Sequence, residues 1–146
     1  MLAIITYAMF ILTGNINEDL AKAIENTVES RGAFTGMTKE ESAALMSAVA
    51  FRESKFNTRM VGDHGSSMGA FQSLGAPRKI LGKCEEQAEL AWTQIEYSVS
   101  RCKSHPIAIY ARGKCSSPSG RRLSNDRMHI AKTILAGYKD AENYQD

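Results

Sequence analysis

Residues 53–72 read ESKFNTRMVGDHGSSMGAFQ, and they mark an abrupt change of pattern in the chain. Before them, Thr38 and Glu41 have the spacing of a capping box, which starts a helix. Apolar residues then recur on one side of that helix, which is predicted to run to about Ser54; they are Leu45, Met46, Val49 and Ala50. From 57 to 75, glycines interleaved with Asp and Ser predict turns and loops, with space for a small hairpin.

Helical patterns lie on both sides of this stretch. Asn17 is followed by two acidic residues and predicts a helix from 17 to about 31. Apolar residues at helical spacing predict another helix over 85–100. Pro106 is expected at the first position of a short helix that reaches Tyr110, and Ser124 is expected to cap the last helix. No repeat or linker interrupts 17–146, which is therefore predicted to be a single domain.

Composition and charge exclude few functions. The chain has 146 residues, of which 43% are hydrophobic, and its net charge of +2 gives little attraction for nucleic acid. The three histidines lack the spacing of a zinc-protease motif, and the glycines fit neither a phosphate loop nor a dinucleotide fingerprint. We therefore expect no metal, no cofactor and no nucleic-acid partner.

The N-terminal segment, residues 1–16, is apolar, and its first 13 residues carry no charged side chain. The run is shorter than the ~20 apolar residues that cross a membrane. It has the length of a signal-peptide core, but it lacks a basic start and a clear cleavage site. A buried first helix and a signal-like or anchor-like segment both remain open, as does contact of residues 1–13 with a membrane.

Glu53 is the candidate catalytic residue. It follows Met46, Val49 and Ala50 by seven, four and three positions, so its carboxyl shares the apolar side of the helix. An apolar setting disfavours the charged form and raises the pKa of a carboxyl, as a glycosidic general acid requires. On position alone, an ordinary glutamate paired with Arg52 or Lys55 is the better interpretation.

The segment as a whole resembles the catalytic segment of lytic transglycosylases of the soluble, goose-lysozyme-like kind. The matching residues are Glu53-Ser54, Phe56-Asn57, Val61-Gly62-Asp63, Gly65, Ser67, Gly69 and Phe71-Gln72. The run 107–113 is similar to a later motif of that family: Tyr110 matches its tyrosine, whereas Ala111 stands where the family has asparagine. Preceded by Cys102, this version resembles the short transglycosylases of tailed bacteriophages. The likeness spans about 17–137 and is sharp only over 45–72.

This resemblance implies a mainly α, lysozyme-like (α+β) fold in which helices and the Gly-rich hairpin or loop segment form a glycan cleft. It implies a peptidoglycan lytic transglycosylase, which cleaves the β-1,4 bond between N-acetylmuramic acid and N-acetylglucosamine and forms a 1,6-anhydro ring. Glu53 would be the catalytic acid and base. The substrate-binding residues would be Ser67, Met68, Gly69, Gln72 and Tyr110.

The resemblance also implies partners and a setting. The partner would be the glycan strands of peptidoglycan, and other virion or tail proteins if the protein belongs to a phage particle. The setting would be a phage virion, or the periplasm and cell wall of a bacterium, during phage penetration or lysis.

Two other functions remain open. Asp63 could be a second carboxylate that positions water, which would make the protein a hydrolytic lysozyme; the interpretation that we favour is an Asp that stabilises its own Gly-Asp turn. The domain could also be a virion component that binds glycan without cleaving it.

The three cysteines show no Cys-x-x-Cys spacing. Cys102 and Cys115 flank the stretch that contains Tyr110, and we predict a disulfide between them if the protein works outside the cytoplasm. Cys84 would then be a spare thiol. Other pairings, and three reduced thiols, are not excluded by the sequence.

Overall fold

The computed structural model describes residues 1–145, and in this range the chain is mainly helical with one small antiparallel sheet. The helices are α1 (Leu2–Thr13), α2 (Glu18–Arg31), α3 (Lys39–Ser54), α4 (Cys84–Arg101), α5 (Ala108–Arg112) and α6 (Pro118–Asn143). The strands are β1 (Val61–Gly62), β2 (Ser67–Met68) and β3 (Ser73–Leu74), with short 3-10 turns η1 (Asp63–Gly65) and η2 (Arg78–Ile80). The predicted fold class is confirmed.

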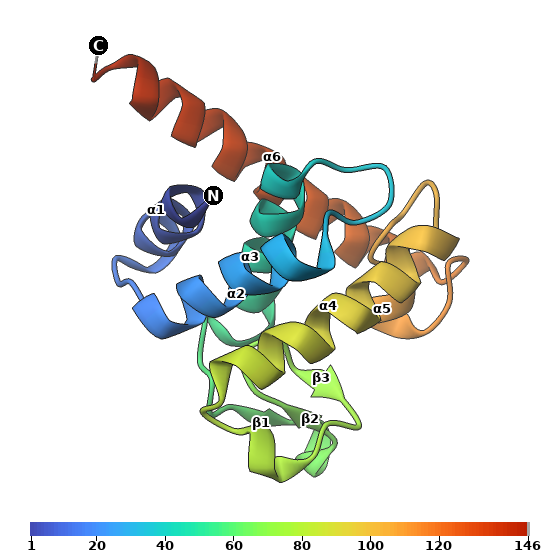
Figure 1. The fold of residues 1–146 in the computed structure, drawn as a ribbon. Coiled ribbons are helices and arrows are strands. Elements are labelled where there is room, and N and C mark those ends of the chain that lie inside the picture. Colours follow the sequence, from blue (N-terminus) through green and yellow to red (C-terminus); the bar gives the residue numbers. More distant parts are fainter. Residues whose placement is uncertain (146) are drawn as a thin grey trace.

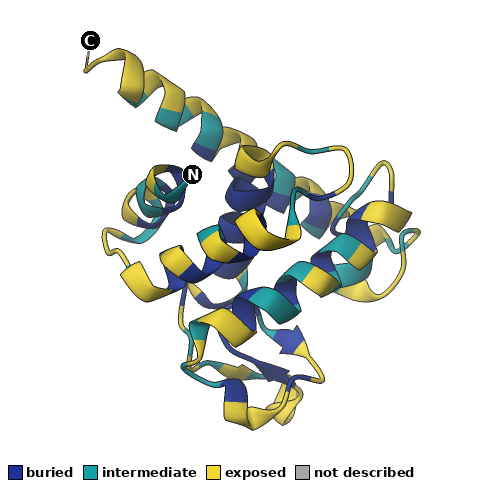
Figure 2. Ribbon diagram, in the orientation of Figure 1, coloured by how far each residue is buried: buried dark blue, intermediate teal, exposed yellow. Residues whose placement is uncertain are grey.

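Helix α3 lies at the centre of the molecule. It packs against α1, α2 and α6, and every residue from 42 to 50 is buried (Figures 1 and 2). Its start is the predicted capping box: the Thr38 side chain accepts a hydrogen bond from the Glu41 backbone, and the Glu41 carboxylate accepts one from the Thr38 backbone. It ends at Ser54, as predicted, because Lys55 and Phe56 both adopt left-handed backbone angles.

The predicted starts of the last two helices are wrong. α5 begins at Ala108 rather than at Pro106, because the Pro106 carbonyl accepts a hydrogen bond from the Ser98 hydroxyl outside the helix. α6 begins at Pro118, the residue type favoured at a first helical position, and Ser117 caps it by accepting a hydrogen bond from the Gly120 backbone. Ser124 is buried within α6, where its hydroxyl accepts a hydrogen bond from the Ile107 backbone.

Helix α1 contributes to the hydrophobic core. Ile5, Ala8 and Met9 are fully buried, and the helix packs against α2, α3 and α6. Within residues 1–145 no helix has both the length and the apolar character needed to cross a membrane.

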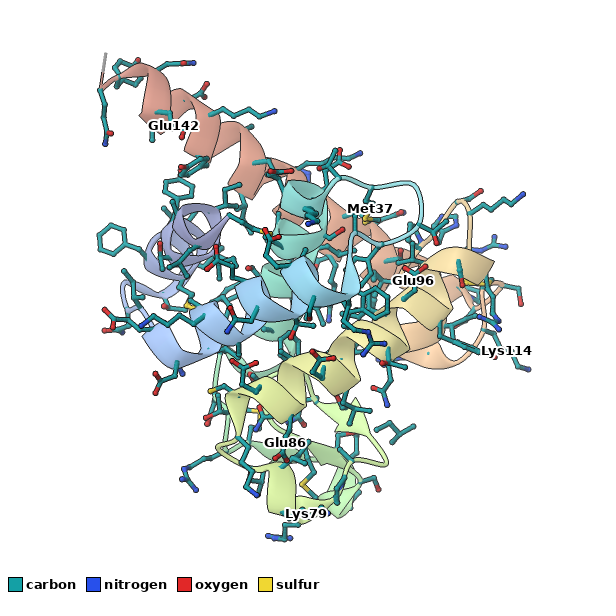
Figure 3. The ribbon with its side chains drawn as sticks, viewed as in Figure 1. Met37, Lys79, Glu86, Glu96, Lys114 and Glu142 are labelled. Atoms are coloured by element: carbon teal, nitrogen blue, oxygen red, sulfur yellow. A yellow bond between two sulfur atoms is a disulfide. The ribbon has the colours of Figure 1, made fainter. Side chains whose placement is uncertain are left out.

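The sheet lies at one end of the molecule, on the far side of α4 from α1 (Figure 1). β2 is its central strand, and it pairs antiparallel with β1 and with β3. The predicted hairpin is therefore a three-stranded meander. Charged side chains such as Lys79 and Glu86 at this end, and Glu142 on α6, lie at the periphery (Figure 3).

Candidate active site

Glu53 lies in the last turn of α3, where the central helix passes into the sheet segment. Its side chain is 26% exposed, so the carboxyl is neither free in water nor sealed in the core. An oxygen of this carboxyl lies 3.5 Å from a guanidinium nitrogen of Arg127 on α6. Glu53 also borders an open pocket of about 340 Å³ with Phe51, Met60 and the residues around it in α3.

The electrostatic setting of Glu53 raises the pKa of its carboxyl. Burial raises the pKa of the Glu53 carboxyl above the ordinary value, and the charge of Asp63 raises it further. The nearby Arg127, and more weakly Arg112, lower the pKa without cancelling the effect of burial. A carboxyl with a raised pKa retains more of its proton near neutral pH, which suits it to protonate a leaving group.

Arg127 belongs to a chain of charged groups that reaches the surface. The residue is only 8% exposed, and its second guanidinium nitrogen donates to the Asp126 carboxylate at 2.8 Å. Asp126 also accepts two hydrogen bonds of 2.9 Å from Arg52. Burial alone would raise the pKa of Asp126, but the hydrogen bonds from Arg52 and Arg127 hold it below its ordinary value. Asp126 is therefore the ionised partner that compensates the buried arginine.

Asp63 and Ser67 bond to each other across the β1–β2 turn. The Ser67 hydroxyl donates to the Asp63 carboxylate at 2.6 Å, and Ser67 itself is buried. Asp63 is exposed and has a φ of 51°, a left-handed conformation that Asp tolerates better than most residues. This geometry supports the turn-stabilising interpretation. Because the charge of Asp63 also acts on Glu53, its carboxylate still lies within electrostatic reach of the site.

Position 69 requires glycine because another side chain of the protein lies against its backbone. Its φ is +81°, and a Cβ at this position would lie 2.5 Å from the Gln87 side chain. The close approach at Gly69 therefore involves Gln87.

Gln87 is 1% exposed and makes three hydrogen bonds. It accepts from the Ala70 backbone, and it donates to the carbonyls of Thr58 and Ile80. One buried amide on α4 thus fixes the middle of the sheet segment.

The Gln72 side chain makes more hydrogen bonds to the backbone than we expected for a residue that contacts substrate. Its amide nitrogen donates to the carbonyls of Met60 at 3.1 Å and Gly69 at 2.9 Å, so both of its donors are used. The residue still borders a second pocket, together with Tyr110. Any hydrogen bond from Gln72 to a ligand would have to use its carbonyl oxygen as the acceptor.

The Met68 side chain lies in a small hydrophobic core of its own. It is 4% exposed and packs with Ala76 and Ile80. We predicted it as substrate-binding, and the structure instead buries it beneath the sheet, because β2 is the central strand and one of its faces must be covered.

Tyr110 on α5 packs over the end of the sheet segment. Its hydroxyl donates to the carbonyl of Phe71, so this proton is not directed to Glu53. Burial, together with the negative charge of Glu53, raises the pKa of Tyr110 well above its ordinary value, and the phenol stays neutral. Tyr110 helps to line a second pocket of about 340 Å³, whose other residues are Gln72, Leu74, Thr93, Gln94, Tyr97 and Ile109.

This second pocket combines exposed apolar side chains with polar groups. Tyr97 is 52% exposed and Leu74 is 67% exposed, so an aromatic and an apolar side chain face water. Amide and hydroxyl groups of Gln72, Thr93 and Gln94 lie around them. Apolar surface with a few polar groups is typical of small-ligand sites.

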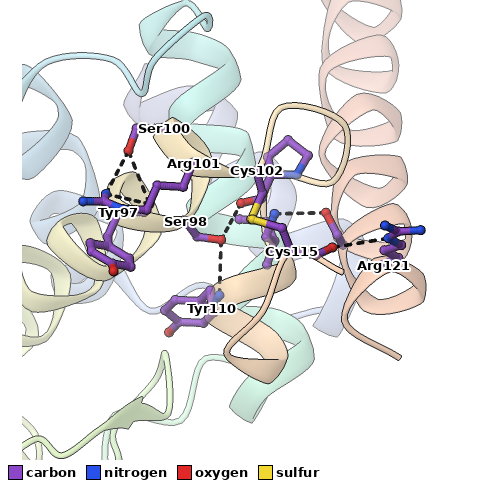
Figure 4. Close-up of a disulfide and its surroundings, with 11 residues drawn as sticks. Tyr97, Ser98, Ser100, Arg101, Cys102, Tyr110, Cys115 and Arg121 are labelled. Atoms are coloured by element: carbon purple, nitrogen blue, oxygen red, sulfur yellow. Dashed lines mark hydrogen bonds between the residues drawn. A yellow bond between two sulfur atoms is a disulfide. The ribbon is translucent and has the colours of Figure 1, made fainter. Parts of the chain in front are cut away.

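A disulfide joins Cys102, at the end of α4, to Cys115, in the loop after α5 (Figure 4). Cys84 is free. The hydroxyl of Ser98 accepts a hydrogen bond from the Tyr110 backbone while it donates to Pro106, so α5 is held both by hydrogen bonds and by the disulfide. The pairing is the one expected, and it fixes the element that carries Tyr110.

Two site residues, Arg127 and Gln87, were missed in the sequence. The sequence pattern could have indicated each of them, because each is a polar residue on an otherwise apolar helix face. Arg127 lies three and four positions before Ile130 and Ala131, and Gln87 lies four before Ala91. A polar group buried on such a face needs a partner, but the pattern does not reveal which partner the fold supplies.

The chain was compared with protein-family models, with curated proteins and with solved structures, and none of them matches it.

Proposed function

We propose that the protein is a peptidoglycan lytic transglycosylase in which Glu53 is the catalytic acid and base. The observation that carries the proposal is the half-buried Glu53 carboxyl with a raised pKa, at an open pocket between the central helix and the sheet segment. The resemblance of residues 53–72 to a transglycosylase segment supplies the substrate.

Glu53 acts twice in the proposed reaction. Its proton goes to the glycosidic oxygen between N-acetylmuramic acid and N-acetylglucosamine as the bond to C1 breaks. The 2-acetamido group of the sugar stabilises the positive charge that develops at C1. The Glu53 carboxylate then takes the proton of the C6 hydroxyl while the C6 oxygen bonds to C1, which closes the 1,6-anhydro ring. One carboxyl suffices, because the substrate performs the second function.

The pocket lined by Tyr97 and Tyr110 would receive the glycan chain next to the cleaved bond. Its exposed apolar surface suits the apolar face of a pyranose ring, and its amides suit acetamido and hydroxyl groups. The Tyr110 hydroxyl, fixed to the Phe71 carbonyl, shapes the pocket and transfers no proton.

Replacement of Glu53 by Gln tests the proposal. Glu53→Gln keeps shape and removes the transferable proton, so cleavage of purified sacculi should fall by ~10²–10⁴-fold. Glu86→Gln, at an exposed position of α4, is the matched control and should cleave like the wild type. Wild-type clearance by Glu53→Gln would refute the proposal. If Glu53→Gln loses cleavage but still binds sacculi, the protein is an enzyme and not a domain that only binds glycan.

Hydrolysis remains a second candidate, because the charge of Asp63 reaches Glu53. Mass spectrometry of the products distinguishes the two reactions. Transglycosylation gives 1,6-anhydromuramic ends, whereas hydrolysis in labelled water gives reducing ends that contain ¹⁸O. If ¹⁸O is incorporated, Asp63→Asn should abolish cleavage, and Asp63 becomes the second carboxylate.

The proposed setting follows from the substrate. The protein would act on the cell wall, as part of a phage virion with other virion or tail proteins, or in the bacterial periplasm at lysis. If the protein is part of a virion, it should be detected in purified phage particles. If it acts at lysis, it should be detected only in lysing cells.

A further inference from the structure

Arg127 is a buried charge on the apolar side of α6. Ser124, Ile130 and Ala131, which lie three positions before and three and four positions after it, are buried as well. A cation removed from water is costly unless charged partners compensate it. The guanidinium has two: Asp126 at 2.8 Å and Glu53 at 3.5 Å, each bound through a different nitrogen.

The two partners of Arg127 are not equivalent. Asp126 accepts hydrogen bonds from two arginines and is held ionised by them. The Glu53 carboxyl lies 3.5 Å from Arg127, longer than an ordinary hydrogen bond, and it stays easier to protonate than a free glutamate. Asp126 therefore fixes the position of the guanidinium, and Glu53 keeps its ability to gain and lose a proton.

We infer that Arg127 is a positioning residue for Glu53: clamped by Asp126, its planar fork holds the carboxyl in place and stabilises the carboxylate that exists between the two proton transfers. This inference rests on the proposed function. In the first transfer, Glu53 gives its proton to the glycosidic oxygen and becomes an anion 3.5 Å from a fixed cation. In the second, the anion takes the C6 hydroxyl proton. Asp126 offsets part of the Arg127 charge, so that the anion is stabilised without losing its basicity.

Other charged groups also face Glu53. Arg112, at the end of α5, lowers the pKa of its carboxyl, and Asp63 in η1 raises it. The Tyr110 phenol on α5 is neutral, and Arg52 on the same helix is engaged by Asp126. Among these groups Arg127 is the one paired with the Glu53 carboxyl, which makes it the group whose removal should change the titration of Glu53 most.

Three variants separate the charge of Arg127 from its geometry. Arg127→Met keeps the aliphatic stem and removes the charge, so the pKa of Glu53 should rise. Asp126→Asn removes the offsetting anion, so the pKa should fall. Arg127→Lys keeps the charge but cannot bind both carboxylates as a fork, so the pKa should stay near that of the wild type. Arg122→Met, at an exposed position of the same helix, is the matched control.

The first measurement is the pH profile of kcat on purified glycan strands. The alkaline limb, where Glu53 loses its proton, should move to higher pH in Arg127→Met and to lower pH in Asp126→Asn. Both Arg127 variants should lose about 10- to 100-fold in kcat with little change in KM, because the carboxyl is displaced from its reactive position. The inference would be overturned if the alkaline limb moved in neither Arg127→Met nor Asp126→Asn. It would also be overturned if the limb moved in the direction opposite to the one expected for each variant. If Arg127→Met does not fold, Asp126→Asn and Arg127→Lys carry the test.

The second measurement does not depend on activity. The Glu53 carboxyl carbon is followed by ¹³C NMR during a pH titration of the wild type, Arg127→Met and Asp126→Asn, with Glu53→Gln used to assign the signal. If Glu53→Gln cleaves sacculi normally, the proposed function fails, whatever the titration shows. If Glu53→Gln is inactive and the titrations of the three proteins coincide, the function stands and the role of Arg127 is refuted.

Discussion

The two parts of the molecule that meet at Glu53 are held in place by different means. Helix α3 is surrounded by other helices, with every residue from 42 to 50 buried, and it begins with a capping box. The segment 55–83 contributes Phe56, Ala70 and Phe71 to the main core and has a small core of its own around Met68, Ala76 and Ile80. It is also held by polar side chains. We therefore expect α3 to tolerate the loss of single contacts better than the sheet segment does.

The polar contacts of the sheet segment come largely from outside it. Ser54, at the end of α3, donates to the Ala70 carbonyl at 2.6 Å and accepts from the Asn57 backbone. Gln87, on α4, binds the backbone at residues 58, 70 and 80. These two side chains link the wall of the candidate site to the helices that carry the rest of it.

The largest predicted effect is at Gln87. Gln87→Met keeps the volume and leaves the buried Ala70 N–H without a partner, at a cost of about 1–3 kcal/mol. It also removes one hydrogen bond each from the carbonyls of Thr58 and Ile80, which still accept from the Gly82 and Lys83 backbone. We expect a loss of about 3 kcal/mol or more in the free energy of unfolding, measured by chemical denaturation. Hydrogen exchange should rise first in 58–82. Gln94→Met, on the same helix with one hydrogen bond to Leu74, is the matched control and should change stability by about 0.5 kcal/mol or less.

Removal of the disulfide should have the next largest effect on stability. Cys102→Ser with Cys115→Ser opens a link between residues 13 apart, which is worth ~3 kcal/mol in the chain-entropy model. Because α5 carries Tyr110, the cleavage rate should fall even under conditions in which the variant is fully folded. Cys84→Ser, which removes the free thiol, serves as control and should alter neither quantity. Equal stability of the double variant and the wild type would contradict the covalent role assigned here to the bridge.

The same contrast explains what could be predicted from the sequence. The capping box at Thr38, the Asn17 cap and the end of α3 near Ser54 are local signals, and all three are confirmed. The role of Gly69 depends on Gln87, which lies 18 residues later in the chain, and the partner of Glu53 lies 74 residues later, on α6. The pattern of a single segment cannot specify such pairings. Ser124 shows the same limit: a serine that could cap a helix instead accepts a hydrogen bond from Ile107.

A smaller effect is expected at the start of α3. Thr38→Ala removes the side chain that accepts from the Glu41 backbone, and loss of an N-cap costs about 1 kcal/mol. The remaining contacts of α3 should keep Glu53 in place, so the variant should cleave sacculi at the wild-type rate below its melting temperature. Thermal denaturation and turbidity assays measure the two quantities. A cleavage defect in a folded Thr38→Ala protein would show that α3 is less independent of its end than its burial implies.

The smallest predicted effect is a pH dependence of the free energy of unfolding. It comes from Glu53, which lies where α3 meets the sheet segment. Burial raises the pKa of Glu53 in the folded protein, so the folded state binds the proton more tightly than the unfolded chain does. The free energy of unfolding therefore contains a contribution that is complete below the ordinary glutamate pKa and is lost as the pH rises through the raised one. Glu53→Gln has no titrating carboxyl at this position, so its free energy of unfolding lacks this pH-dependent loss. The stability difference, variant minus wild type, should be constant at low pH, increase across that window, and level off above it. Denaturation curves of both proteins at several pH values measure this difference. If it instead decreased with rising pH, the attraction of Arg127 would outweigh burial, and Glu53 would be a structural ion-pair partner rather than an acid ready to give up its proton.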